Sequence, residues 1–535
     1  MKKFPIKPLA LVLSLIFTLP AQADSERETL ETLRETTHAL LDALVQKGIL
    51  TPEVAQGLIK QAEKKAHDKV AANPQAETAP GVIRVPYIPE NVKREIREQI
   101  RQEVVAQAKT EQWGNVNAVP EWIDRLKWSG DIRLRYQNDI FARNNSSGID
   151  FSGEPYGLGS NLNPINTTED RQRFRLRARL ALAAKVTDYV SAGFRITTGN
   201  LTDPVSTNQT LGTDFNKYTL VLDQAFIKAQ PWDWLSVSGG RIPNPFFSTN
   251  LVWADDLNFE GVAATASPWL HSDSSAKPFF TVGVFPLKEV ESSAVNLARD
   301  KWLYAAQAGL DWKMDANTRW RFGLAYYDYK NIAAVKDPIN FDGRYDYADS
   351  ILTARQKGNT RFQVSPSPTD RPDLYGLAAD YSLVNLTGTV DLAHLDPVHV
   401  IVDGDVVKNV GYDTTRVNSR LLTPQQPRTL GWQTKVTVGW PVIQNKNDWQ
   451  VFMGYRHLER DAVLDAFADS DFRLGGTNSQ GFFVGGSYGV DRNSWVSIKW
   501  LSADQIDGYV DPVTLMKDQF RFSTDVIQVD FNAKF

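Results

Sequence analysis

Short segments in which apolar and polar residues alternate recur from about Pro120 to the end of the chain. In 128–137 every second residue is apolar, and in 171–180 the residues between the apolar ones include four arginines. The same pattern returns at 302–312, 319–327 and 432–440. Because successive side chains of a β-strand point to opposite faces, each segment predicts a strand with one apolar and one polar face. A tilted strand of roughly 9–11 residues crosses a bilayer.

We predict sixteen such strands, centred near residues 132, 177, 195, 224, 238, 261, 282, 307, 322, 377, 402, 434, 454, 485, 498 and 529. Their connections alternate in length. Those after odd-numbered strands tend to be long, as at 139–169 and 331–371, and those after even-numbered strands tend to be short, as at 187–188 and Asn385. Long outside loops and tight periplasmic turns are typical of outer-membrane barrels.

The N-terminus predicts export. Lys2, Lys3 and Lys7 precede an apolar stretch at 9–19, and Ala21-Gln22-Ala23 follows as a cleavage site. This order is typical of a secretory signal peptide, here 1–23. No other stretch approaches 18 consecutive apolar residues, so a membrane-embedded mature chain has to be a closed β-barrel.

A helical region precedes the strands. Leucines at helical spacing and a Thr51-Pro52-Glu53 helix start predict a helical hairpin or short coiled coil over 24–72. A proline-rich linker spans 73–90, a further helix spans 91–121, and the barrel spans 122–535. Self-association of the helices and a solvated hairpin both remain open as interpretations.

Composition and motifs exclude several function classes. The 535-residue chain has no cysteine and a net charge of -4, which excludes disulfides, thiol chemistry and whole-chain binding of nucleic acid. Gly485–Gly489 fits a serine-hydrolase motif but lacks the strand-turn-helix context. Asp403-Gly404-Asp405 lacks the further ligands of a calcium loop. We therefore expect no enzyme activity, no metal and no cofactor.

Tryptophans gather at the short turns. An indole ring with a polar N–H favours the membrane–water boundary. We therefore predict a periplasmic aromatic girdle consisting of Trp232, Trp234, Trp312, Trp320, Trp440, Trp449 and Trp495.

The last predicted strand ends in an aromatic residue. Four apolar residues between Ile527 and Ala533 alternate with polar ones before Phe535. With Phe531 and Phe535, this strand looks like the assembly signal of bacterial outer-membrane barrels. We expect the barrel assembly machinery to bind it.

Five stretches and the terminal Phe535 carry a resemblance to a known family. The stretches are 40–53, 84–109, 128–136, 173–180 and 239–261. In these the chain resembles the "putative porin" family of Gram-negative outer-membrane proteins, which pair a short helical periplasmic segment with a barrel. The resemblance implies passive diffusion of small solutes.

Arginines recur on the polar face of the first three strands. An arginine that faces lipid at mid-bilayer costs roughly 2–4 kcal/mol, so the alternation places them on the lumen wall. This predicted ladder consists of Arg133, Arg135, Arg173, Arg175, Arg177, Arg179 and Arg195. Either it steers anions, or its arginines are paired with lumen acids such as Asp131, Asp311 and Asp530.

The segment 241–259 is unusually apolar for an outside loop. As a candidate constriction it offers Arg241, Phe246, Phe247, Trp253, Asp255 and Asp256. Folded into the lumen, the aromatic residues would narrow the pore and the two acids would face the basic wall. Packing on the barrel rim or at a subunit contact is the other interpretation.

Together these features predict an all-β transmembrane barrel that acts as a diffusion porin in the outer membrane of a Gram-negative bacterium. The helical extension would lie in the periplasm. Expected partners are outer-membrane lipid, two further copies in a homotrimer, and peptidoglycan. The alternative is a structural anchor whose helices tether the membrane to peptidoglycan or a periplasmic partner. Ester hydrolysis by Ser487 is a third class.

Overall fold

A computed structural model describes most of the predicted barrel. It describes residues 98, 100, 102, 123–146, 166–269, 274–338, 345–354, 356–365, 374–421, 423–510 and 517–535. The predicted signal peptide, the 24–72 helices and the 73–90 linker lie outside the described residues. Within 91–121, residues 98, 100 and 102 are described and are helical.

Sixteen long strands build the wall within the described residues. They are β1 (Leu126–Phe141), β2 (Arg171–Lys185), β3 (Val190–Thr198), β5 (Leu220–Trp232), β6 (Leu235–Pro243), β7 (Asn258–Ala266), β8 (Ala276–Lys288), β9 (Lys301–Lys313), β10 (Thr318–Lys330), β13 (Ser382–Leu395), β14 (Val398–Asn409), β15 (Leu430–Gly439), β16 (Trp449–Leu458), β17 (Ser479–Asp491), β18 (Ser494–Gln505) and β21 (Thr524–Lys534). The two-residue strand β4 (Gln209–Thr210) pairs with β2.

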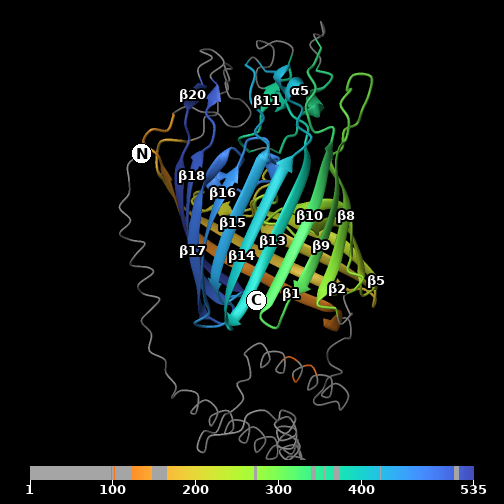
Figure 1. Cartoon of the computed structure of the whole chain (residues 1–535), viewed down its shortest axis with the longest axis vertical. Helices are drawn as coiled ribbons and strands as arrows, with labels where there is room; N and C mark the ends of the chain where they lie inside the picture. The colour runs from red at the N-terminus through yellow and green to blue at the C-terminus, as the bar shows by residue number, and fades with distance from the viewer. Residues whose placement is uncertain are drawn as a thin grey trace, which may run out of the picture. The chain divides into compact units, whose positions relative to one another are not determined.

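The sheet closes on itself, as Figure 1 shows. Each long strand pairs antiparallel with the next, and β1 also pairs antiparallel with the last strand, β21. Arg135 of β1 therefore lies opposite Arg175 of β2 on one side and Asp530 of β21 on the other. Closure gives each of the sixteen described wall strands a partner on both sides, which a lipid environment requires. The prediction of a sixteen-stranded antiparallel barrel is confirmed.

The two faces of the wall differ in polarity. On β1, Ile132 and Leu134 are 47% and 45% exposed on the outer face, whereas Arg135 and Gln137 are 1% exposed on the inner face. On β18, Ile498 and Trp500 point outward, and Leu501 and neighbouring inner residues are buried. Apolar side chains thus face the lipid side and polar ones the lumen, as the alternation predicts.

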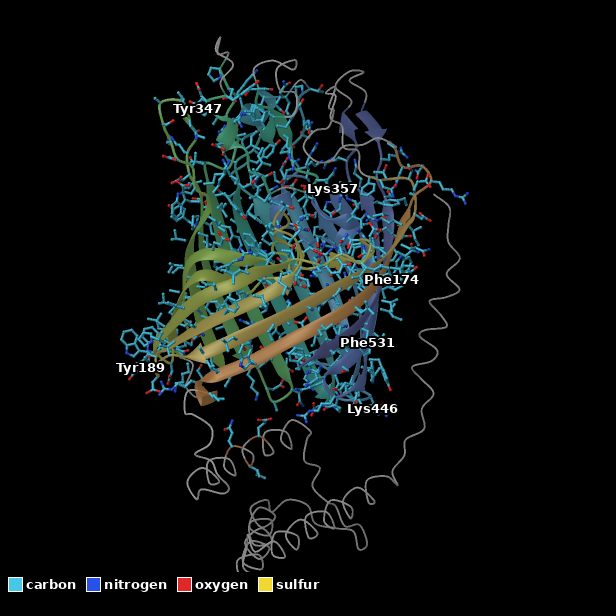
Figure 2. All side chains as sticks on the ribbon, turned by 180° about the vertical axis from the view of Figure 1, so that it is seen from behind. Phe174, Tyr189, Tyr347, Lys357, Lys446 and Phe531 are labelled. Carbon is cyan, nitrogen blue, oxygen red and sulfur yellow. The ribbon has the colours of Figure 1, made fainter. Side chains whose placement is uncertain are left out.

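Connections of two lengths lie at opposite ends of the barrel. Short connections lie at 186–189, 233–234, 267–275, 314–317, 396–397, 440–448 and 492–493. Long connections lie at 142–170, 199–219, 244–257, 289–300, 331–381, 410–429, 459–478 and 506–523. In Figure 2, Tyr189 and Lys446 mark the short-connection end, and Tyr347 and Lys357 mark the long-connection end.

Several long connections contain short elements of their own. These are η3 (Ala348–Ser350), β11 (Arg361–Gln363), β12 (Tyr375–Leu377), α5 (Thr414–Asn418), η4 (Asp465–Phe467), η5 (Phe472–Leu474), β19 (Tyr509–Val510) and β20 (Lys517–Phe520). A further element, η2 (Ile123–Arg125), directly precedes β1.

The predicted strand near residue 377 and the predicted turn at Asn385 are wrong. Residues 375–377 form the short β12, and Asn385 lies within β13, where it is fully buried. Its amide donates to Asp405 and to the Val406 carbonyl, so a polar residue typical of turns occupies a lumen position. The apolar residues Leu377, Ala378 and Ala379 pack among the connections and do not face lipid, which explains why this segment resembled a membrane strand.

The seven tryptophans of the predicted girdle all lie beside short connections. Trp232 and Trp234 stack with ring centroids 5.5 Å apart and are 57% and 41% exposed. Trp312 and Trp320 lie opposite each other on the two strands that the short connection 314–317 joins. The membrane-boundary role of these residues stays a prediction.

The largest buried apolar cluster lies in the half of the barrel that carries the long connections. It joins residues of 244–257, 331–381 and 459–478 to inner wall residues such as Tyr327 and Leu383. Trp253, 2% exposed, packs against Tyr327 and Phe467 with ring centroids 5.2 and 6.0 Å away. Three connections are therefore packed against one another and against the inner wall.

Candidate functional site

The arginines of the predicted ladder line one side of the lumen. Arg133 lies opposite Arg177 across the β1–β2 pair, and Arg135 lies opposite Arg175. Arg195 follows on β3, beside the same wall. Side chains of equal charge on neighbouring positions repel one another unless acids or water screen them.

Acidic side chains neutralise most of this ladder. Asp131 contacts both Arg177 and Arg179, at 3.0 and 2.7 Å. Further ion pairs join Arg173 to Asp139 at 2.8 Å, Arg195 to Asp223 at 2.5 Å, and Arg135 to Asp530 at 2.7 Å. Asp311 pairs with Arg319 elsewhere on the wall. These contacts match the second interpretation of the ladder, in which lumen acids pair with the arginines.

Two ladder arginines bond neutral amides instead. Arg133 donates to the Oδ1 of Asn208, and Arg175 donates to the Oε1 of Gln137 at 3.3 Å. Both side chains are partly buried and face the lumen side of their strands. Their charge is therefore the part of the ladder that no directly bonded carboxylate cancels.

The connection 244–257 crosses the lumen. Gln307 of β9 accepts from the Phe247 N–H at 2.8 Å and donates to its carbonyl at 2.7 Å. Thr249 Oγ1 donates to Asp405 of β14 at 2.5 Å, and Asn250 Oδ1 accepts from Arg456 of β16 at 2.8 Å. Backbone and side chains of one connection thus bond to the inner faces of three strands.

Phe246, Phe247 and Trp253 take different positions in this connection. Phe246 and Trp253 are buried in the aromatic cluster around Tyr327. Phe247 is partly exposed, and the guanidinium of Arg321 lies 4.3 Å from its ring centroid. Arg241 lies at the end of β6, where it pairs with Glu260 at 2.5 Å.

The two acids of this connection point to different surroundings. Asp256 lies 3.3 Å from Arg179 and 3.5 Å from Arg177, and it accepts from Thr207 Oγ1 at 2.8 Å. Asp255 instead is exposed and lines a cavity on the opposite side. Since consecutive side chains diverge here, the expectation that both acids face the basic wall holds for Asp256 alone.

Two further long connections, whose inward packing sequence reasoning missed, belong to the same packed interior: 459–478 bonds to 244–257, and 331–381 bonds to 459–478. The Ala254 N–H donates to the Phe467 carbonyl at 3.0 Å, which joins 244–257 to 459–478. In turn, Asn359 Nδ2 donates to the carbonyls of Arg460 and Val463, at 2.7 and 2.8 Å. The sequence feature that could have predicted this packing is the apolar and acidic composition of 461–472, which resembles that of 244–257.

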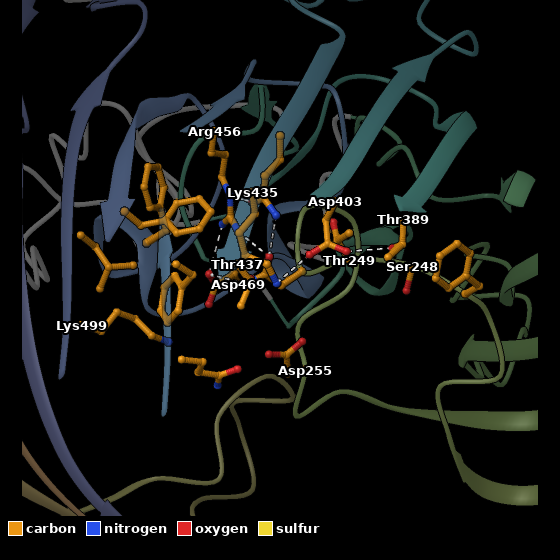
Figure 3. Close-up of a pocket in the computed structure, with 18 residues that line it drawn as sticks. Ser248, Thr249, Asp255, Thr389, Asp403, Lys435, Thr437, Arg456, Asp469 and Lys499 are labelled. Carbon is orange, nitrogen blue, oxygen red and sulfur yellow. Dashed lines mark hydrogen bonds and ion pairs between the residues drawn. The ribbon is translucent and has the colours of Figure 1, made fainter. Parts of the chain in front are cut away.

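A cavity of about 390 Å³ lies between connection 244–257 and the inner faces of β13 to β18 (Figure 3). Its charged lining residues are Asp255, Asp403, Lys435, Arg456, Asp469 and Lys499. Lys435 pairs with Asp403 at 2.9 Å, and Arg456 pairs with Asp469 at 3.1 Å. The cavity is thus a polar space inside the barrel, large enough for a small solute.

The motifs that suggested other chemistry have local structural roles. Ser487 Oγ lies 2.8 Å from Ser497 Oγ within the β17–β18 pair. Asp403 accepts from Thr389 and pairs with Lys435, and Asp405 accepts from Thr249. Among the described residues, no group of three or more histidines and acids is arranged to hold a metal ion.

Comparisons with solved structures find outer-membrane barrels. The outer membrane channel DcaP of Acinetobacter baumannii is 11% identical, with 77% of this chain and 97% of that chain covered and a TM-score of 0.38. OprB of Pseudomonas putida is 11% identical over 79% and 97%, with a TM-score of 0.43. OmpT of Vibrio cholerae, described as a trimer form, is 10% identical over 77% and 99%, with a TM-score of 0.39.

The remaining comparisons concern curated proteins and protein families. No curated protein matches the chain. The helices of the described residues include none that is long and apolar enough to cross a membrane. A family model described as putative porin matches residues 34–535, which is most of the chain. The protein therefore belongs to the putative porin family.

Proposed function

We propose that the protein is a diffusion channel of the outer membrane for small hydrophilic solutes, with a modest preference for anions. The observation that carries the proposal is the closed wall of sixteen strands with a polar inner face and a solute-sized cavity inside it. Barrels of this strand number are wide enough for an aqueous channel. Membership of the putative porin family supports the same function.

The anion preference rests on the arginines that bond amides. Arg133 and Arg175 keep a positive charge beside the lumen that no directly bonded carboxylate balances. A wall of net positive charge raises the local concentration of anions. Because the other ladder arginines are paired, the preference is weaker than seven free arginines would produce.

Solute flux tests the channel, and reversal potentials test its selectivity. Purified full-length protein in liposomes should allow swelling in sugars and small acids. Swelling at background level would contradict a channel and favour the alternative function, a structural anchor tethered through the N-terminal helices. In planar bilayers under a salt gradient, Arg175→Gln should shift the reversal potential towards cations, and Asp131→Asn should shift it towards anions. Cation preference of the unmodified protein would contradict anion selectivity.

The inward connection 244–257 is proposed as the constriction. Phe247 and Asp255, which are not buried in the aromatic cluster, would set the width and charge of the remaining passage. Shortening 246–252 should raise single-channel conductance, and so should the milder Phe247→Ala. The matched control is a deletion within 424–427 of the long connection 410–429, which removes no residue of the buried apolar cluster and should leave conductance unchanged.

The proposal also covers assembly and location. The signal peptide directs export, and the barrel assembly machinery inserts the chain through its last strand. The N-terminal helices lie in the periplasm, within reach of peptidoglycan, and three copies associate in the membrane. Cross-linking of the native oligomer and pull-down with purified peptidoglycan test these last two points separately.

A further inference from the structure

Some of the charged side chains around the 390 Å³ cavity form ion pairs with one another, and others do not. Four of the six charged side chains form the pairs Lys435–Asp403 and Arg456–Asp469. The side chains of Asp255 and Lys499 make no hydrogen bond or ion pair with another described residue. They belong to different elements, since Asp255 lies on connection 244–257 and Lys499 lies on β18.

Asp255 and Lys499 face the same space. In Figure 3 both side chains point into the cavity, Lys499 from the wall and Asp255 from the connection that crosses the lumen. Lys499 lies on the inner face of β18, because its neighbours Ile498 and Trp500 are exposed on the outer face. One negative and one positive side chain without a directly bonded partner thus face this cavity.

The polar lining residues that connection 244–257 contributes besides Asp255 are mostly occupied. Asn250 accepts from both Arg456 and Gln433, at 2.8 and 3.1 Å, and Thr249 donates to Asp405. These bonds hold the connection against the wall. A solute entering the cavity therefore finds its free charged partners at Asp255 and Lys499 rather than along the whole lining.

Part of the cavity lining is apolar. Phe452, Phe472, Phe483 and Leu501 line this part of the cavity and form one packed group. Phe452 is partly exposed, whereas Phe472, Phe483 and Leu501 are 1%, 8% and 5% exposed and present only small areas to the cavity. Such a surface favours contact with an apolar group of a solute over contact with water. Asp255, Lys499 and the apolar residues line one cavity, so a single small molecule can reach all of them.

We propose that this cavity is a binding subsite for small zwitterions with an apolar side chain, of the α-amino acid type. Lys499 would donate to the carboxylate, Asp255 would accept from the ammonium group, and the partly exposed Phe452 would contact the apolar side chain. A solute with one charge would leave either Asp255 or Lys499 without a partner, and an unpaired charge in a confined site is unfavourable. The inference rests on the proposed function, because the solute has to enter the barrel.

Current block in planar bilayers tests the subsite with the full-length protein. We use L-phenylalanine as the zwitterion, N-acetyl-L-phenylalanine as its anionic analogue and L-phenylalaninamide as its cationic analogue. L-Phenylalanine should block the salt current at concentrations about ten-fold or more below those of either analogue, as expected for one additional charge-assisted bond. Equal block by all three compounds would overturn the proposal.

Variants distinguish the two charges from general effects on the pore. Asp255→Asn and Lys499→Gln should each weaken block by L-phenylalanine about ten-fold or more. The double variant Asp255→Lys with Lys499→Asp should restore block, since a zwitterion can bind in the reverse orientation. The control Arg319→Gln, which removes a charge outside this cavity, should leave block unchanged.

The outcomes separate this inference from the proposed function. Unchanged block in both single variants, with normal conductance, would overturn the subsite and leave the channel intact. If the unmodified protein conducted no salt current, the proposed channel function itself would be contradicted. Heat-modifiable migration in gels establishes that each variant is folded before its block is measured.

Discussion

Arg135 and Asp471 are 336 positions apart in the chain, yet Nη1 of Arg135 lies 3.0 Å from Oδ2 of Asp471. The same guanidinium donates to Asp530 through Nε at 2.7 Å and Nη2 at 2.9 Å. It therefore joins the two strands that close the barrel, β1 and β21, to the connection 459–478. Since Arg135 is 1% exposed, this is a buried link between the wall and a segment that packs inside the barrel.

Removing this arginine should destabilise the protein strongly. Arg135→Gln leaves the buried Asp530 and the partly buried Asp471 without their shared cation, and breaking a buried ion pair in this way costs about 3–5 kcal/mol. The denaturation midpoint of the purified barrel, followed by gel mobility, should fall accordingly. Arg319→Gln is the control, because the Arg319 side chain is 59% exposed and its pair should contribute under about 1 kcal/mol. Equal losses in both variants would contradict this role of Arg135.

The link should weaken at acid pH. Burial alone would raise the pKa of Asp471, but the charges of Arg135, Lys499 and Arg133 outweigh burial and hold the pKa well below its ordinary 3.8. The folded state therefore binds fewer protons than the unfolded state, so the stabilisation is full above about pH 4 and is lost as pH falls further.

Hydrogen exchange of residues 465–474 measures this loss. After correction for the intrinsic pH dependence of exchange, protection should decline below pH 4 in the unmodified protein. Asp471→Asn cannot titrate at this position, so its protection should be lower above pH 4 and should change less below it. Parallel pH profiles for the two proteins would show that Asp471 is not the responsible group.

The wall was predictable because its physics is local. Ile132 and Leu134 alternate with Arg133 and Arg135, and this two-residue period specifies both the strand and its faces without knowledge of any partner. The strand around Asn385 was missed because its lumen side is covered by connections. In the sequence, a single asparagine such as Asn385 is typical of a turn, whereas here its amide is buried and hydrogen-bonded within the wall.

The interior was less predictable because it depends on contacts between distant segments. The composition of 241–259 indicated a loop with a special position, but not that Thr249 reaches Asp405 or that Asp255 and Asp256 diverge. The pairing of Arg135 with Asp471 and the placement of Lys499 beside the cavity follow from packing that no period in the sequence encodes.

Glycine at position 261 should be required for strand pairing. Gly261 has φ of +139°, and a Cβ at this position would lie 2.2 Å from the Val284 carbonyl oxygen of β8. Gly261→Ala therefore adds backbone strain, about 1–3 kcal/mol, to a backbone clash. The folded fraction after refolding should fall several-fold. Gly404→Ala in β14 is the matched control, because nothing lies within 4 Å of its Cβ position, and it should refold normally.

The terminal residue closes the barrel and should also direct its assembly. The Gly130 N–H donates to the Phe535 carbonyl at 2.9 Å, and the Phe535 N–H donates back to Gly130 at 3.0 Å. Deleting Phe535 removes both bonds and the terminal aromatic ring, so the level of folded barrel in the outer membrane should fall at least several-fold. Phe535→Tyr keeps the bonds and an aromatic ring and should assemble normally.

Refolding in detergent separates the two effects of this deletion. Two hydrogen bonds at the end of a strand contribute about 1–3 kcal/mol together, so the purified variant should still refold without the assembly machinery. Poor assembly in cells combined with good refolding in detergent would locate the defect in recognition of the last strand. Equal loss in both settings would show that Phe535 acts through stability alone, and a normal level in cells would contradict both roles.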